Sequence, residues 1–201
     1  PEAAPENYLV YVGAVQSWQG IEVLFKAMTF LADMPDLKLV LCVSGSRQRL
    51  KFLSKLSERM QINDRLIWQY RLNQNELLPW LAHARISLAP LTECSRNLQQ
   101  GCCPLKILES MAMKVPVIAS DMPVVKELID HNQTGWLVRA DRPSELARAV
   151  RILMANQAEA DRIKNAAHEK TLRDFSWQKA ATELRALYNQ LTGVGIVSEK
   201  L

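Results

Sequence analysis

Cysteine is scarce in this sequence, and the few cysteines are poorly spaced for a metal site or a disulfide framework. Only four occur in 201 residues: Cys42, Cys94, Cys102 and Cys103. A small secreted scaffold would be denser in cysteine, and a zinc site would need paired ligands at loop spacing. We therefore expect reduced thiols, a cytoplasmic location and no bound metal. The adjacent Cys102 and Cys103 leave two interpretations open, a redox device or two small residues packed at a crowded turn.

Long apolar runs are missing as well, and the excess of positive charge is small. No stretch of about 18 apolar residues occurs, so we expect no membrane-spanning helix. The formal net charge of +4 argues against a protein that coats nucleic acid but allows a local basic site for an anion. The chain begins at Pro1 without a charged-then-apolar signal segment, so we expect an excised domain or a processed chain.

Two glycine-rich phosphate motifs are also absent. Neither GxGxxG nor the P-loop GxxxxGK[ST] occurs among the seven glycines. An ordinary NAD or ATP site of the Rossmann type therefore has little support.

Apolar segments that end in turns alternate with helical patterns along almost the whole chain. The predicted strands are 8–13, 37–45, 65–70, 86–91, 116–120 and 136–138. The predicted helices are 21–31, 49–60, 76–84, 105–113, 123–129, 143–155, 158–173 and 177–191. Because the strands are almost uniformly apolar, they are typical of a sheet covered on both faces. The sequence predicts an α/β, Rossmann-like, three-layer αβα fold with a mostly parallel six-stranded sheet.

In an open parallel sheet, ligands bind beyond the carboxyl ends of the strands. The loops there are 13–20, 45–47, 70–72 and 92–104. Their glycines fit either a phosphate-binding turn at a helix start or plain turns.

The segment 92–109 is the most informative of these regions. Arg96 lies in a polar loop, and Lys106 and Glu109 follow three residues apart on a predicted helix. That spacing suits a helix-face ion pair. It also suits a cation placed near a diphosphate beside a carboxylate that receives sugar hydroxyls.

Two segments stand out, PLKILESMAMKVPVIASDMPVVKELIDHNQTGWLV and YLVYVGAVQSWQGIEVLFKAM. Together they resemble the C-terminal donor-binding domain of retaining GT-B glycosyltransferases. The resemblance covers roughly residues 8–190. It implies that Glu109 holds the ribose hydroxyls of a nucleotide-sugar and that the turn at 104–106 presents backbone N–H groups to its phosphates. Tyr70, Arg71 and Leu72 would lie beside the base. The implied catalytic residues are Lys106, Glu109 and Arg96. The implied donor site comprises Gly13, Ala14, Gly45, Arg47, Tyr70, Arg71, Leu72, Pro104, Leu105, Lys106 and Glu109.

The same resemblance implies transfer of a hexosyl group from a nucleoside diphosphate with retention, in polysaccharide biosynthesis, without a cofactor or a metal. Residues 1–7 would link to a missing N-terminal acceptor-binding domain, 8–192 would form the nucleotide-sugar domain, and 193–201 would be a flexible tail. The expected partners are the nucleotide-sugar and that N-terminal domain, and no nucleic acid. Any contact with a membrane surface would be made through the N-terminal domain. The last helix would cross toward the missing half, so Trp177, Leu184 and Leu187 are either interface residues or part of this domain's own core.

Three departures from the family pattern leave the activity open. The family usually pairs Glu109 with a second Glu eight residues earlier, where this chain has Gly101, and carries Arg and Lys where this chain has Ala14 and Gln19. Either Arg96, Lys106 and Arg47 replace the missing cations, as in transferases that resemble this chain in a QGCCPLK stretch, or the chain is a non-catalytic binding module. A nucleotide-sugar epimerase is a third interpretation, and the lack of a recognisable catalytic acidic cluster counts against it.

Overall fold

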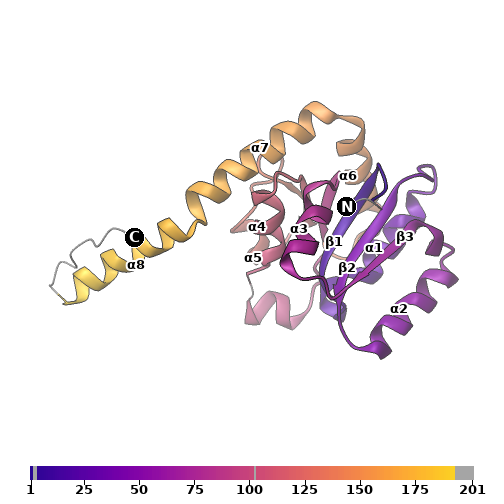
Figure 1. Cartoon of the computed structure of the whole chain (residues 1–201), viewed down its shortest axis with the longest axis horizontal. Coiled ribbons are helices and arrows are strands. Elements are labelled where there is room, and N and C mark those ends of the chain that lie inside the picture. The colour runs from indigo at the N-terminus through magenta and orange to yellow at the C-terminus, as the bar shows by residue number, and fades with distance from the viewer. Residues whose placement is uncertain (2–3, 102, 193–201) are drawn as a thin grey trace.

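The computed structural model describes residues 1, 4–101 and 103–192 (Figure 1). Its strands are β1 (Tyr8–Ala14), β2 (Lys38–Ser44), β3 (Leu66–Tyr70), β4 (Ile86–Ala89), β5 (Val117–Ser120) and β6 (Trp136–Val138). Its α-helices are α1 (Ile21–Phe30), α2 (Arg47–Arg59), α3 (Gln74–Ala82), α4 (Leu105–Ala112), α5 (Pro123–Lys126), α6 (Pro143–Ala155), α7 (Gln157–Asp174) and α8 (Trp177–Thr192).

The six strands form one sheet in the order β3-β2-β1-β4-β5-β6, and every pairing is parallel. This confirms the predicted α/β fold with a parallel six-stranded sheet. The prediction succeeded because a sheet buried on both faces favours apolar strands without alternation. The chain leaves β3 at one edge and returns to β4 beside β1. This reversal lies between β1 and β4, and ligands of open parallel sheets bind near such a point, beyond the carboxyl ends of the strands.

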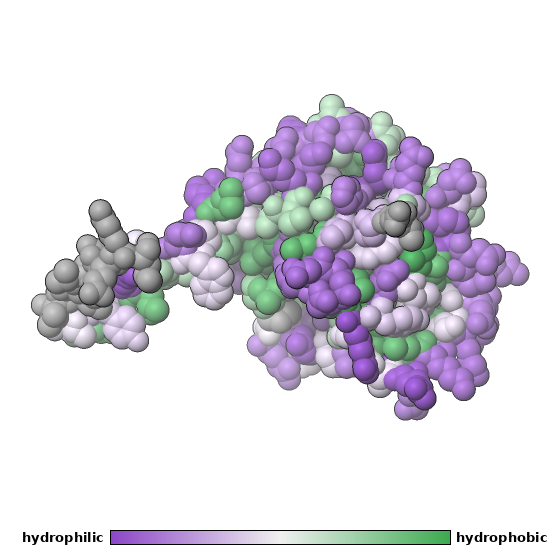
Figure 2. All heavy atoms as spheres, viewed as in Figure 1, coloured by the Kyte–Doolittle hydropathy of each residue, from purple (hydrophilic) through white to green (hydrophobic). Residues whose placement is uncertain are grey.

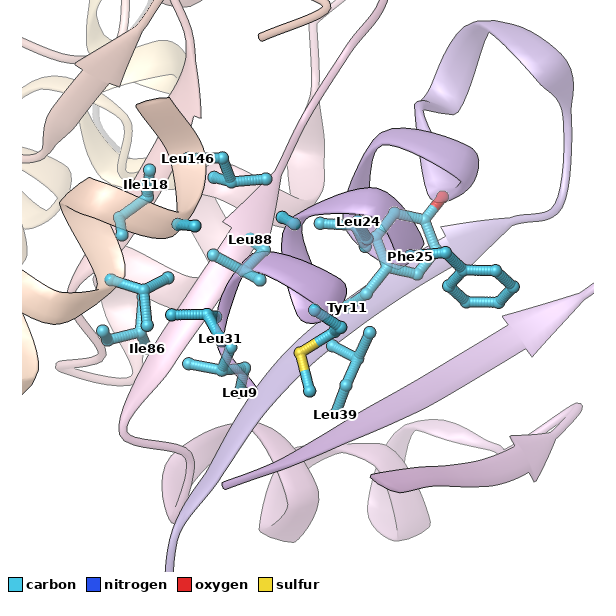
Figure 3. Packing of buried hydrophobic residues seen from close by; sticks show 14 of the residues in the cluster. Leu9, Tyr11, Leu24, Phe25, Leu31, Leu39, Ile86, Leu88, Ile118 and Leu146 are labelled. Atoms are coloured by element: carbon cyan, nitrogen blue, oxygen red, sulfur yellow. The ribbon is translucent and has the colours of Figure 1, made fainter. Parts of the chain in front are cut away.

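Successive residues of β1 point to opposite faces and enter different cores. Leu9 and Tyr11 pack against α1, α2 and α6, as Figure 3 shows for part of this cluster. Tyr8 and Val10 pack under α3, and the other half of that face is covered by α4, α5 and α7. The sheet is therefore the middle layer of three, as the sequence predicts.

Capping residues decide where two helices begin. The Ser46 side chain accepts a hydrogen bond from the Arg49 N–H, so α2 starts at Arg47 and not at 49. Asn73 and Glu76 form a reciprocal capping box, so α3 starts at Gln74 and not at 76. Both starts were predicted two residues too late because a cap is a local bond that apolar periodicity does not report.

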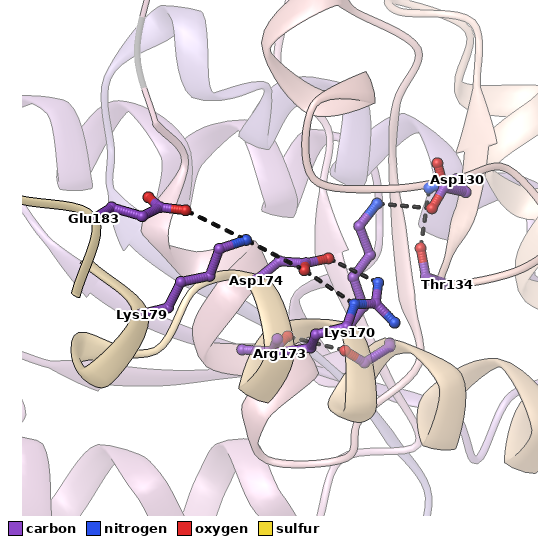
Figure 4. Close-up of polar contacts among 9 residues, drawn as sticks. Asp130, Thr134, Lys170, Arg173, Asp174, Lys179 and Glu183 are labelled. Atoms are coloured by element: carbon purple, nitrogen blue, oxygen red, sulfur yellow. Dashed lines mark hydrogen bonds and ion pairs between the residues drawn. The ribbon is translucent and has the colours of Figure 1, made fainter. Parts of the chain in front are cut away.

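Helix α7 is tied to the body of the domain, whereas α8 runs out from it (Figure 1). Lys170 on α7 pairs with Asp130 at 2.7 Å, and Asp174 pairs with Lys179 at 3.6 Å across the junction with α8 (Figure 4). No residue of α8 is buried. Within the described ranges, no helix combines the length and the apolar character that a membrane crossing demands.

The apolar residues of α8 stay exposed: Trp177 is 87% exposed, Leu184 54% and Leu187 51%. Figure 2 shows hydrophobic residues along the projecting helix, while the side of the body that carries α2 is mainly hydrophilic. Packing of these three side chains on the domain's own core, one of the two predicted arrangements, is therefore wrong. The predicted tail at 193–201 lies outside the described residues.

Candidate functional site

A crevice lies at the carboxyl ends of β1, β2 and β3. It consists of two adjoining hollows of about 160 and 240 Å³, which share Val43, Ser44 and Arg71. Parallel strands bring their carboxyl ends to one edge of the sheet, so loops far apart in sequence meet there. Among the predicted donor-site residues, those that line the crevice are Gly13, Gly45, Arg47, Tyr70, Arg71 and Leu72.

Two glycines keep the floor of the crevice free of side chains. Gly13 has φ +144°, and a Cβ there would lie 2.9 Å from the Lys106 Nζ. A Cβ on Gly45 would lie 2.1 Å from the Val15 side chain. The φ of Gly13 strains any other residue, and the Val15 side chain near Gly45 is buried, so both positions favour glycine, and a ligand can approach the backbone closely.

An aromatic pair and a cation lie at the β3 side of the crevice. The rings of Tyr70 and Trp68 stack at a centroid distance of 6.0 Å and an angle of 8°, and Tyr70 remains 53% exposed. Partial burial raises the pKa of the Tyr70 hydroxyl above its ordinary value, so it stays protonated at neutral pH. Arg71 takes a left-handed conformation with φ 52° and donates its N–H to the Val43 carbonyl at 3.0 Å. A flat ring and a guanidinium thus flank the opening.

Lys106 reaches from α4 to the end of β1. Its Nζ donates to the Gln19 Oε1 at 2.5 Å and lies 4.3 Å from the centroid of the Tyr11 ring. The Tyr11 hydroxyl donates in turn to the Ala14 carbonyl at 2.9 Å. The ion pairs between described residues do not join Lys106 to Glu109. The helix-face pair allowed by their spacing is therefore not formed.

Glu109 lies one turn further along α4 and is half-buried. At the start of α4, Leu105 donates its N–H to the Cys103 carbonyl at 2.9 Å, and Ile107 donates to the Pro104 carbonyl at 2.8 Å. The turn at 104–106 was predicted to offer its N–H groups to phosphates. Within that turn the Leu105 N–H has a protein acceptor, and the role of the turn toward phosphates stays a prediction.

Arg96 lies in a π-helical turn, Arg96–Gln100, where the sequence predicts only a polar loop. Its guanidinium lies 5.0 Å from the centroid of the Trp18 ring. The neighbouring Asn97 is fully buried, and its Nδ2 donates to the carbonyls of Trp18 and Thr92, both at 2.9 Å. The loop after β4 is thereby fastened to the loop after β1.

The predicted residues thus fall into groups. One group lines the crevice. A second group, Lys106, Gly13 and Ala14, meets at the end of β1. Arg96 approaches Trp18 instead of either group, and the roles assigned to all of these residues stay predictions. Cys102 lies outside the described residues, so the two interpretations of the cysteine pair also stand as they were.

Sequence reasoning placed the loops 13–20 and 92–104 in this region but gave no role to Tyr11, Trp18 or Asn97, and it treated Gln19 only as a lost lysine. Tyr11 and Asn97 carried no signal, because an apolar strand and a polar loop hide which side chain turns inward. Gln19 did carry one, since it occupies the position where the resembled family has a cation.

The comparisons with known proteins bear on the family and the fold of the chain. A family model described as glycosyl transferases group 1 matches residues 1–170. The amylovoran biosynthesis glycosyltransferase AmsK of Erwinia amylovora is 29% identical over 118 residues, which are 59% of this chain and 29% of AmsK. The crystal structure of Anabaena Alr3699/HepE in complex with UDP has a TM-score of 0.78 at 18% identity, covering 94% of this chain and 50% of that one.

A single domain gives a near one-to-one match. The C-terminal domain of a glycosyl transferase group 1 family protein, LpcC, from Francisella tularensis has a TM-score of 0.76 at 18% identity. The match covers 88% of this chain and 90% of that domain. By contrast, the chain spans less than half the length of the curated relatives that it matches. The chain therefore belongs to the glycosyl transferases group 1 family and has the fold of the C-terminal donor-binding domain of a GT-B glycosyltransferase.

Proposed function

We propose that this chain binds a nucleoside-diphosphate sugar and forms the donor half of a retaining hexosyltransferase. The observation that carries the proposal is the crevice, in which Gly13, Gly45, Arg47, Tyr70 and Arg71 meet at the carboxyl ends of three strands. The exposed Tyr70 ring offers a stacking surface for a base. The glycines allow a phosphate to approach the backbone, and the guanidinium groups supply positive charge.

In the proposed reaction the bond between the anomeric carbon and the diphosphate oxygen breaks, and an acceptor hydroxyl forms the new bond on the same face of the sugar. The hydroxyl proton passes to the departing diphosphate. Negative charge grows on that leaving group, so fixed cations lower the barrier. Lys106 and Arg47 are the proposed sources of this charge, and no metal or cofactor takes part.

The acceptor requires a second half, which we propose is an N-terminal domain of the same protein. HepE, whose chain is about twice as long as the matched region, supports this arrangement. The exposed apolar face of α8 is the proposed contact with that half. AmsK, named for amylovoran biosynthesis, supports a role in making a polysaccharide. We place the protein in the cytoplasm, where nucleotide-sugars are made, with any membrane contact through the other half.

Calorimetry of this chain against UDP-, GDP- and ADP-sugars tests the proposal. We expect one base to bind at least tenfold more tightly than the other two, in competition with its own free nucleoside diphosphate. The sugar phosphate without a nucleoside serves as the control and should bind far more weakly. If none of the nucleotide-sugars binds better than that control, the proposal is wrong.

One observation favours the alternative of a non-catalytic nucleotide-binding module. Gly101 stands where the family has its first Glu, and its φ of +70° with ψ 154° is a conformation for glycine alone. A chain that binds the donor but gives no transfer after fusion to an acceptor half would support this alternative.

A further inference from the structure

The position of the Lys106 ammonium depends on two side chains from the first strand and the loop that follows it. The Nζ is hydrogen-bonded to Gln19 at 2.5 Å and lies 4.3 Å over the ring of Tyr11, which is fully buried. We infer that Gln19 and Tyr11 are positioning residues that hold Lys106 as the cation for the donor diphosphate. This inference rests on the proposed function.

Gln19 and the Tyr11 ring are neutral, and this matters for the charge that a ligand meets. A carboxylate at position 19 would cancel the ammonium charge, whereas an amide oxygen and a ring face orient the ammonium and leave its charge in place. A nucleoside diphosphate brings about two negative charges, while a helix N-terminus offers only about half a positive charge. An ammonium group oriented by an amide oxygen and a ring face adds positive charge for such a ligand at the end of β1.

The loop that carries Gln19 is held firmly. Gly20 takes φ +77°, and a Cβ there would lie 1.7 Å from the Pro90 carbonyl oxygen. The carbonyl of Trp18 accepts hydrogen bonds from the Thr92 N–H at 3.2 Å and from the Asn97 side chain at 2.9 Å. Gln19 is therefore placed before a ligand arrives, so its amide can orient Lys106 without a conformational cost.

The Lys106 ammonium lies close to the backbone of Gly13 at the end of β1. A Cβ at this position would lie 2.9 Å from Nζ and 3.2 Å from the Tyr11 hydroxyl. Gly13 also lines the crevice beside Arg71 and Leu72. A phosphate lying against the Gly13 backbone would thus meet the ammonium directly.

Calorimetry with UDP and uridine separates phosphate recognition from nucleoside recognition. GDP with guanosine and ADP with adenosine are the second and third pairs. The quantity compared is the ratio of diphosphate to nucleoside affinity. We expect Lys106→Met to lower this ratio about 10- to 100-fold, the range for a lost charge-assisted bond. Gln19→Ala should lower it several-fold, and the double variant should be no worse than Lys106→Met alone, because Gln19 acts through Lys106.

Gln19→Glu distinguishes positioning from a purely structural role. It retains a partner for the ammonium, but its carboxylate repels the diphosphate, so we expect the ratio to fall at least as far as in Gln19→Ala. Gln16→Ala in the same loop and Lys26→Met on α1 are the matched controls, since both side chains are exposed, and neither should change the ratio.

Each result decides between distinct conclusions. If the wild-type chain binds the diphosphates but Gln19→Ala leaves the ratio unchanged, or if the losses in the double variant simply add, the inference is overturned and the proposed function stands. If the wild-type chain binds none of the six compounds, the proposed function itself fails, and the inference falls with it.

Discussion

The carboxylates of Glu109 and Glu22 differ in their ion pairing. Glu22 on α1 pairs with Arg49, whereas in the part of the chain that the structure describes the Glu109 carboxylate forms no ion pair. Half-buried on α4, it is available to accept bonds from a ligand. The carboxylate is therefore compatible with the proposed role of holding two ribose hydroxyls.

We predict that Glu109→Ala abolishes binding of the nucleotide-sugar and leaves the fold intact. The two charge-assisted hydrogen bonds expected from this carboxylate are each worth about 1.5–3 kcal/mol. Calorimetry measures the affinity, and the melting temperature reports the fold. Glu58→Ala, an exposed residue of α2, is the matched control. Unchanged affinity in Glu109→Ala would remove Glu109 from the site.

A second prediction concerns the cations that the family carries in its first loop. Because Lys106 already occupies the space beside Gln19, the restored pair Ala14→Arg and Gln19→Lys should add little or no affinity for a UDP-type ligand. A lysine at position 19 would also place two ammonium groups within a few ångströms, where they repel each other. Calorimetry of the double variant against UDP tests this.

Lys106→Met in the same assay should weaken binding by about 1–3 kcal/mol, the range for a hydrogen bond to a charged group. A large gain from the restored pair, with no loss in Lys106→Met, would instead mean that the phosphate site is vacant. That result would favour the non-catalytic module.

At the scale of elements, the sequence predicts strands and helices well where apolar residues recur at a fixed period. The π-helical turn Arg96–Gln100 escaped prediction because its residues are polar and aperiodic. The predicted strand 86–91 ends at Ala89, since Pro90 cannot donate to the ladder.

The site was predicted only in part, for a similar reason. Strand order and the ends of strands place the loops, so a crevice at 13, 45 and 70–72 follows from the sequence. The bond between Lys106 and Gln19 joins residues 87 positions apart. Nothing local reports such a contact, because it depends on how α4 packs against the sheet.

Asn97 links the two loops that frame this region, and we predict that Asn97→Ala destabilises the domain. The change takes away the Asn97 donor from the Thr92 carbonyl and leaves the Trp18 carbonyl with the Thr92 N–H alone, which costs about 1–3 kcal/mol in the free energy of unfolding. Urea denaturation measures this loss. Asn165→Ala, exposed on α7, is the control and should lose little. Equal stability of the two variants would show that the loops hold together without Asn97.

At the scale of the whole molecule, ion pairs over the surface predict sensitivity to acid. Hydrogen bonds from Arg or Lys partners lower the pKa of five carboxyl groups: Asp33, Glu145, Glu159, Asp161 and Asp174. Since these pKa values are lower in the folded state, the pairs stabilise the folded state. Their contribution is complete when the pH is above the pKa values of the same groups in the unfolded chain, about 4. That contribution is lost as the pH falls through the lowered folded values.

We therefore expect the melting temperature to fall as the pH is lowered from about 5 to 3, and to fall less steeply at high salt, which screens exposed pairs. Scanning calorimetry at two salt concentrations measures both effects. A melting temperature that stays constant or rises on acidification would show that these pairs add nothing to stability.

Helix α8 adds exposed apolar area to the domain without adding to its core. Its large side chains stand on one helical stripe, with Leu191 75% and Tyr188 52% exposed. Such a face normally lies against another protein surface, because an exposed apolar stripe on a free domain favours association. The chain as it stands should therefore self-associate through α8 when the proposed N-terminal half is absent.

Ending the chain after Ser176 tests this, since α8 holds no buried residue. We predict that the shortened chain melts within about 2–4 °C of the full chain, the shift expected for a change near 1 kcal/mol in a domain of this size. It should keep its affinity for the nucleotide-sugar, because the crevice lies at the ends of β1, β2 and β3. Analytical ultracentrifugation should show the full chain associating and the shortened chain remaining monomeric. A fall of about ten degrees or more in the melting temperature would mean that α8 packs on its own domain in solution. Self-association of the shortened chain would mean that the associating surface lies outside α8.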